Sequence, residues 1–93
     1  MGQMNVDPQK VEELIKRLHV HTQNTQNAQK QLKGYLTSMQ QYWNDAHYKA
    51  FVEQFNEFDK SMLKALQLSE TVLLPNLKNV KKFAEEYKNM GRK

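Results

Sequence analysis

A chain of 93 residues with a mass of 11.0 kDa and a net charge of +4 is long enough for one small domain, residues 1–93. The absence of cysteine excludes disulfides, thiolate zinc sites and cysteine nucleophiles. Three glycines and two prolines are too few for the turns of an all-β fold. Because a domain this small and polar is marginal as a monomer, we expect it to oligomerise.

The positive charge is concentrated at the C-terminal end, where residues 75–93 hold six basic and two acidic side chains. We interpret this excess mainly as a solvated helix face with cations near a helix C-terminus. The alternative is contact with an anionic partner, a membrane surface or nucleic acid. The residues concerned are Lys78, Lys81, Lys82, Lys88, Arg92 and Lys93.

A long helix is predicted over about residues 8–43. Asp7 is a suitable N-cap, and Pro8 fits the first helical position, where a missing N–H costs nothing. Steps of three and four residues then repeat along a heptad seam, which is typical of a helix packed against another. The seam consists of Val11, Leu14, Leu18, His21, Thr25, Ala28, Leu32, Tyr35, Met39 and Tyr42.

The only tryptophan, Trp43, stands directly before two turn-prone residues, Asn44 and Asp45. Asn tolerates the left-handed conformation that ends many helices, and Asp caps the start of the next helix. We therefore predict a turn at residues 44–45. A connection this short makes the two flanking helices antiparallel neighbours.

The second helix is predicted over about residues 46–89, with a kink near Pro75. Proline removes one helical hydrogen bond and clashes with the preceding turn, so a kink or short break is expected at about residues 71–75. The apolar row before Pro75 consists of Tyr48, Phe51, Phe55, Phe58, Met62, Ala65 and Leu66. The row after it, in a shifted register, consists of Leu73, Leu77, Val80, Ala84 and Tyr87.

These patterns predict an all-α fold, an antiparallel helical hairpin that pairs into a four-helix-bundle dimer. One hairpin uses only part of each apolar stripe, and a second hairpin would cover the rest. A symmetric homodimer is the simplest arrangement, and a heterodimer is equally compatible. The residues predicted to pack within the hairpin or across the dimer are Leu14, Leu18, Leu32, Met39, Phe55, Phe58, Met62 and Leu66.

No set of residues has the spacing of a reactive site, so we predict a protein that is not an enzyme. His19 and His21 are two residues apart and point to different sides of a helix, and His47 stands alone. Ser38, Ser61 and Ser69 lie in no nucleophile motif. We therefore expect no catalytic residue, no cofactor, no metal site and no small-molecule substrate.

The turn and its surroundings resemble the WXG family of small helical proteins associated with type VII (Esx-type) secretion. Trp43-Asn44-Asp45 corresponds to the family's Trp-x-Gly, and Phe51 matches its aromatic residue eight positions after the tryptophan. Asp45 stands where the family has glycine, which makes this a divergent Trp-x-Asp variant. Tyr87 occupies the first position of the family's C-terminal Tyr-x-x-x-Asp/Glu export signal, but Gly91 stands at the acidic position.

The resemblance implies a non-enzymatic secretion substrate or adaptor that acts as a dimer with itself or with a related WXG-like protein. Trp43, Asn44, Asp45 and Phe51 would form a recognition surface for a secretion ATPase or a larger cargo protein. It also implies synthesis in the bacterial cytoplasm and secretion without a cleaved signal peptide. The alternatives are a cytoplasmic helical scaffold or regulator, and a weak nucleic-acid binder that uses the basic C-terminal helix.

Overall fold

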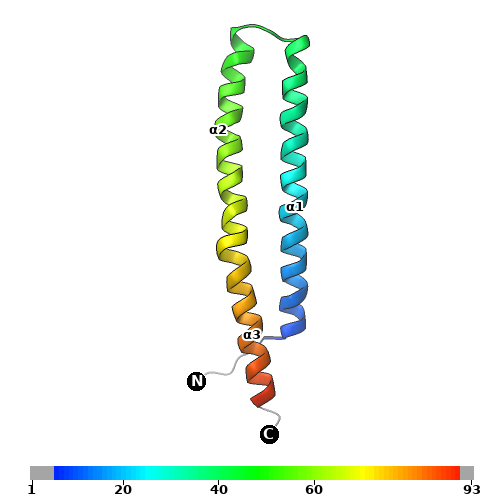
Figure 1. Ribbon diagram of the computed structural model, residues 1–93, viewed down its shortest axis with the longest axis vertical. Coiled ribbons are helices and arrows are strands. Elements are labelled where there is room, and N and C mark those ends of the chain that lie inside the picture. The colour runs from blue at the N-terminus through cyan, green and yellow to red at the C-terminus, as the bar shows by residue number, and fades with distance from the viewer. Residues whose placement is uncertain (1–5, 91–93) are drawn as a thin grey trace. The chain divides into compact units, whose positions relative to one another are not determined.

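The computed structural model describes residues 6–90, and this part of the chain is helical with no strand (Figure 1). Its elements are α1 (Pro8–Ser38), η1 (Met39–Gln41), α2 (Ala46–Leu68), η2 (Ser69–Leu73) and α3 (Leu74–Met90). The chain reverses direction between α1 and α2, which confirms the predicted all-α helical hairpin.

The chain forms two compact units, and each is described by itself. The turn unit is Thr22–Gln67, which holds the second part of α1 and nearly all of α2. The terminal unit contains the described residues up to His21 together with the chain from Leu68 onward. Whether these units amount to a single domain over residues 1–93 stays a prediction.

Asp7 caps the start of α1. Its Oδ1 accepts a hydrogen bond from the backbone N–H of Gln9 at 2.9 Å, and its carbonyl accepts from Val11 at 3.1 Å. The N–H of Gln9, one of the groups that a helix start leaves without a partner, is thereby satisfied, and the bond from Val11 is the first bond of the helix itself.

The first helix ends differently from the prediction of continuous helix to residue 43. α1 ends at Ser38, and the chain tightens into the 3₁₀ turn η1, in which the N–H groups of Tyr42 and Trp43 both reach the carbonyl of Met39 at 2.8 Å. The hydroxyl of Ser38 donates to the carbonyl of Tyr35 at 2.6 Å. This local bond competes with continued helix, as serine side chains commonly do.

The connection to the next helix is Tyr42–Asp45, longer than the predicted turn at residues 44–45. No described residue has a positive φ, so the prediction that Asn44 adopts the left-handed conformation is wrong. Because η1 already turns the chain, Asn44 needs no special conformation. Asp45 starts α2 by accepting the N–H of Tyr48 on its carboxylate at 3.0 Å.

The core of the turn unit mixes aromatic and polar side chains. Two cross-helix hydrogen bonds connect α1 to α2: the hydroxyl of Tyr48 donates to the carbonyl of Leu36 at 2.7 Å, and the amide of Gln29 donates to Asp59 Oδ1 at 3.0 Å. Lys33 adds an ion pair to Asp59 Oδ2 at 3.6 Å. The buried residues of this unit are Thr22, Gln29, Tyr48, Phe55 and Leu66.

The irregularity expected near Pro75 takes the form of a widened turn instead of a break. In η2 the N–H of Leu74 reaches back five residues to the carbonyl of Ser69, which is π-helical geometry. Pro75 has no N–H for the ordinary bond, so widening the turn before it lets the helical path continue. α3 follows directly and runs to Met90.

The terminal unit contains buried small residues and an ion pair that joins its helices. Pro8, Ser69 and Ala84 are buried, and small side chains let neighbouring helices approach closely. Lys81 Nζ lies 2.9 Å from Glu12 Oε1, which connects α3 to α1. Throughout residues 6–90, no helix combines the length and apolarity needed to cross a membrane.

Candidate interaction surface

An aromatic cluster occupies the turn. The ring of Trp43 meets Tyr48 edge-on, with centroids 5.3 Å apart, and lies tilted against Phe51 at 6.1 Å. Trp43 is half-buried, Tyr48 is buried and Phe51 is exposed. The structure therefore brings together Trp43 and Phe51, two of the residues predicted to form the recognition motif.

The other two predicted motif residues are Asp45, which binds the backbone at the start of α2, and Asn44, which faces solvent. Asp45 caps α2 through Tyr48, and its Oδ2 lies 4.0 Å from His47 Nδ1. Asn44 is exposed. The sequence pattern predicts Tyr48 only as part of the apolar row before Pro75, and not as part of the recognition motif. Its position three residues after a capping Asp is the signal that could have located it at the turn.

The residues predicted to pack fall into three groups by exposure. Phe55 and Leu66 are buried, and Leu18, Met39 and Met62 are half-buried. The third group, which is exposed, consists of Leu14, Leu32 and Phe58. The hairpin itself thus covers only part of this set, and the assignment of the exposed members to a dimer stays a prediction.

Exposure separates two rows along α1. The row that faces the second helix repeats every seven residues as Pro8, Ile15, Thr22, Gln29, Leu36 and Trp43, and all of these are buried or half-buried. The neighbouring row repeats as Leu14, His21, Ala28, Tyr35 and Tyr42, and all of these are exposed. The predicted seam therefore included one row that the hairpin leaves open.

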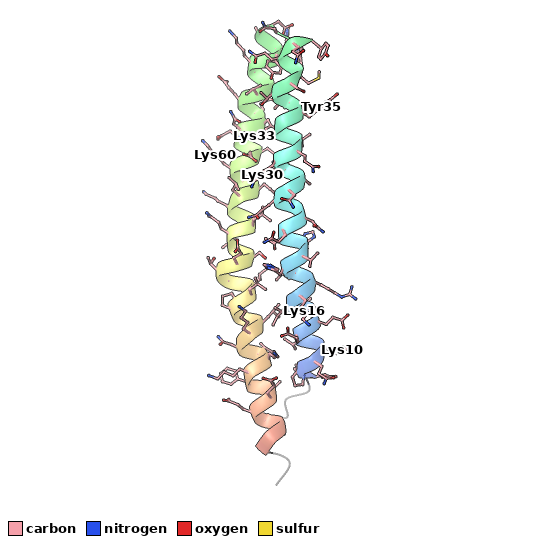
Figure 2. The ribbon with its side chains drawn as sticks, turned by 45° about the vertical axis from the view of Figure 1, so that its right-hand side comes forward. Lys10, Lys16, Lys30, Lys33, Tyr35 and Lys60 are labelled. Atoms are coloured by element: carbon pink, nitrogen blue, oxygen red, sulfur yellow. The ribbon has the colours of Figure 1, made fainter. Side chains whose placement is uncertain are left out.

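The turn unit consequently has an outer apolar face, which we define as Leu32, Tyr35, Phe51 and Phe58. Their exposed fractions are 49%, 67%, 43% and 49%. None of the four lines the two grooves of this unit, where Lys30, Lys33, Asp59 and Asn56 are found. In Figure 2, Tyr35 projects from α1 away from Lys30 and Lys33; Lys33 is two positions before Tyr35, and residues at that spacing on a helix do not face each other.

The described residues contain no group of three or more His, Cys, Asp or Glu side chains that could hold a metal ion. His19, His21 and His47 are exposed and come from separate positions along the hairpin. Glu12 and Lys81 form an ion pair within the terminal unit. The side-chain hydrogen bond from Lys81 lowers the pKa of Glu12, and the same bond raises the pKa of Lys81.

The C-terminal region contains the remaining predicted site residues. Tyr87 is exposed on α3, whereas Gly91 lies outside the described residues, so the geometry of the export signal is not defined. Of the basic residues considered for nucleic-acid binding, Lys81 is engaged by Glu12 and Glu85. Lys78 and Lys82 are exposed, and Arg92 and Lys93 lie outside the described residues.

The chain matches a protein-family model. The model described as "Proteins of 100 residues with WXG", WXG100, matches residues 3–72. This range contains α1, the aromatic cluster at the turn, and α2. Comparisons with curated proteins and with solved structures give no match.

Proposed function

Because the chain belongs to the WXG100 family, we propose that it is a non-enzymatic type VII secretion substrate or adaptor that works as a dimer. Proteins of this family are small, generally lack enzymatic activity and typically associate in pairs, either with themselves or with a related protein. In this proposal, the partner is a second helical hairpin of the same or a related chain.

The observation that carries the proposal is the outer apolar face of the turn unit. Two phenylalanines, a leucine and a tyrosine are each between 43% and 67% exposed on a small polar protein. Removing apolar surface from water is worth about 25 cal/mol per Å², so covering four large side chains is a substantial gain. A second hairpin laid on this face would complete a four-helix bundle.

The aromatic cluster at the turn has a proposed role in recognition. The ring of Trp43 contacts both Tyr48 and Phe51, which restrict its orientation, while Tyr42 beside it is 81% exposed. Rigid, partly exposed aromatic residues are favoured at protein interfaces. Together with the helix ends of the partner, this cluster would form the surface that a secretion ATPase or a larger cargo protein binds.

The sequence at the C-terminus supports the adaptor form of the proposal. Tyr87 stands at the first position of the family's export signal, but Gly91 replaces the acidic residue. A partner that carries a complete signal would then direct the pair. The protein would be made in the bacterial cytoplasm and would leave the cell, in complex, without a cleaved leader.

Light scattering of the purified protein at micromolar concentration tests the dimer. We expect about twice the monomer mass of 11.0 kDa, or a complex of defined mass with a co-purified hairpin protein from the native host. Phe58→Asp should abolish the association because it places a charge on the outer apolar face. Lys60→Asp, on an exposed residue of the same helix, is the matched control.

A well-folded monomer that captures no hairpin partner would contradict the dimer. Secretion is tested in the native host by comparing the wild-type protein with Trp43→Ala. We expect loss of secretion or of partner binding with helix content retained. If secretion persists unchanged, Trp43 has only a packing role. A protein with no secreted fraction and no secretion partner would be a cytoplasmic scaffold instead.

A further inference from the structure

The terminal unit contains a groove between α1 and α3. It is lined by Ile15, Lys16, His19, Val20, Leu74 and Lys78. Three of these side chains, Ile15, Val20 and Leu74, form an aliphatic floor. Lys16 and Lys78 contribute one ammonium group from each helix; Lys16 is marked in Figure 2. The groove therefore combines an apolar strip with positive charge.

These two ammonium groups have no carboxylate at contact distance among the described residues. The nearby Glu12 is held by Lys81 at 2.9 Å, and Glu13 is held by Arg17 at 2.8 Å. Lys16 and Lys78 affect Glu12 only through longer-range Coulomb attraction. Their charge is thus available to an anionic group brought by another molecule.

We propose that this groove docks an acidic amphipathic helix of a different protein. An amphipathic helix binds a groove by inserting an apolar ridge, and charges that flank the ridge select the partner. Here the ridge would lie on Ile15, Val20 and Leu74, and carboxylates on its two sides would meet Lys16 and Lys78. The same division of roles is found between core and flanking positions in coiled coils.

A second copy of the chain fits this groove poorly. Its acidic segments carry cations nearby. Glu12 and Glu13 are followed by Lys16 and Arg17, Glu53, Glu57 and Asp59 stand between Lys49 and Lys60, and Glu85 and Glu86 stand between Lys82 and Lys88. Such a segment would bring its own lysine or arginine side chains close to Lys16 and Lys78, which form the charged rim of the groove. Single-stranded nucleic acid is also disfavoured, because the groove offers no phenylalanine, tyrosine or tryptophan ring on which successive bases could stack.

The inference goes beyond the proposed function. The groove shares no residue with the outer apolar face of the turn unit, so a hairpin on that face and an acidic helix in this groove are separate events. The groove could be occupied even if the chain were a monomer. Failure of one interaction therefore does not imply failure of the other.

The test uses the full-length protein and two labelled peptides of about three heptads, monomeric at the concentrations used, in a fluorescence anisotropy titration. Both peptides have leucine or isoleucine at the core positions. The acidic peptide has glutamate at the flanking positions, and the basic peptide has lysine there. The variant that reverses the rim charge is Lys16→Glu with Lys78→Glu. Its matched control is Lys49→Glu with Lys64→Glu, two exposed lysines of α2.

We expect the wild-type protein to bind the acidic peptide, with an affinity that falls as salt is added. The rim variant should bind it about tenfold more weakly, and the control within about twofold of wild type. The rim variant should also gain affinity for the basic peptide. Val20→Asp, on an exposed floor residue, should weaken both peptides, with circular dichroism verifying that the helices persist.

Three results would overturn the proposal. The first is equal binding of the acidic and basic peptides by the wild-type protein. The second is unchanged affinity for the acidic peptide in the rim variant. The third is failure of the peptide to bind while vesicles of phosphatidylglycerol bind through Lys16 and Lys78, which would assign the groove to a membrane surface.

Discussion

Tyr48 joins three features of the turn in one residue. Its backbone N–H is capped by Asp45, its ring meets Trp43 at 5.3 Å, and its hydroxyl donates to the carbonyl of Leu36 at 2.7 Å. The last bond connects the end of α1 to the start of α2 across twelve residues of sequence. The orientation of Trp43 therefore depends on a residue outside the Trp-x-Asp motif itself.

Tyr48→Phe should reduce the free energy of unfolding by about 1 kcal/mol, because the ring stays and one partly buried hydrogen bond is lost. Urea unfolding followed by circular dichroism measures this change. Tyr42→Phe is the control, since Tyr42 is 81% exposed and lies outside the outer apolar face, so this substitution should leave stability unchanged. Equal effects of the two substitutions would mean that the Tyr48 hydroxyl contributes no net stability.

The motif could be predicted from the sequence in part. Trp43 and Phe51 match a family pattern, and the structure brings their rings to 6.1 Å. The capping role of Asp45 also follows from its residue type and position. The place of Tyr48 at the start of α2 follows from Asp45, but the contacts of its side chain with Trp43 and Leu36 could not be predicted, because they depend on how the chain folds back at the turn.

At the scale of the element, the sequence predicts the helices better than it predicts their contacts. Apolar residues spaced three and four positions apart identify α1 as a helix, but two neighbouring rows of residues on that helix fit this spacing. The row that faces α2 includes two polar residues, Thr22 and Gln29, and this break in its apolar pattern explains why the predicted seam contains the row of Leu14 and Tyr35 instead. Gln29 is buried because Asp59 accepts its amide hydrogen bond, a pairing between residues thirty apart.

Alanine substitutions of Leu73 and Leu74 test whether the widened turn η2 shifts the packing row. The sequence places Leu73 in the packing row, but the π-helical turn shifts the row by one residue, so Leu74 is half-buried and Leu73 is 49% exposed. Leu74→Ala should therefore cost about 1–2 kcal/mol of stability, and Leu73→Ala less than about 0.5 kcal/mol. Thermal unfolding of the two variants measures the difference, and a larger cost for Leu73 would contradict the shifted register.

The ion pair between Glu12 and Lys81 predicts a defined pH dependence. Because the pKa of Glu12 is lowered from 4.5 in the folded protein, its contribution to stability is present above that value and is lost as the pH falls through the folded pKa. The pKa of Lys81 is raised from 10.5, so its contribution is present below that value and is lost as the pH rises through the folded pKa. The pair is thus fully effective between these two ordinary values.

Glu12→Gln should remove the part of the pH dependence of stability that arises on the acid side from the Glu12 carboxylate. Its melting temperature should lie below that of the wild-type protein at neutral pH, and the two should converge as the pH is lowered well below 4.5. Circular dichroism melts at a series of pH values give the comparison. Glu53→Gln, which removes an exposed carboxylate on α2, should run parallel to wild type. A constant offset between Glu12→Gln and wild type at every pH would rule out the ion pair as the cause.

For the molecule as a whole, the proposed dimer couples folding to concentration. A protein whose native state is a pair melts at a higher temperature when it is more concentrated. We expect the melting temperature of the wild-type protein to rise with concentration and that of Phe58→Asp to stay constant. A concentration-independent melt of the wild-type protein would mean that the outer apolar face has no partner copy.

The widened turn η2 also bears on how the length of such a helix can change. Within the terminal unit, the inward positions run Ser69, Leu74, Leu77, Lys81 and Ala84, so a single step of five interrupts steps of three and four. A π-helical turn has the geometry of an α-helix that has received one extra residue. Deleting one residue between Ser69 and Leu74, with Pro75 replaced by alanine, would restore a step of four and leave the spacing from Leu74 to Ala84 intact. A single-residue deletion here need not disturb packing on either side, so this segment is where relatives with a shorter helix could differ at low cost.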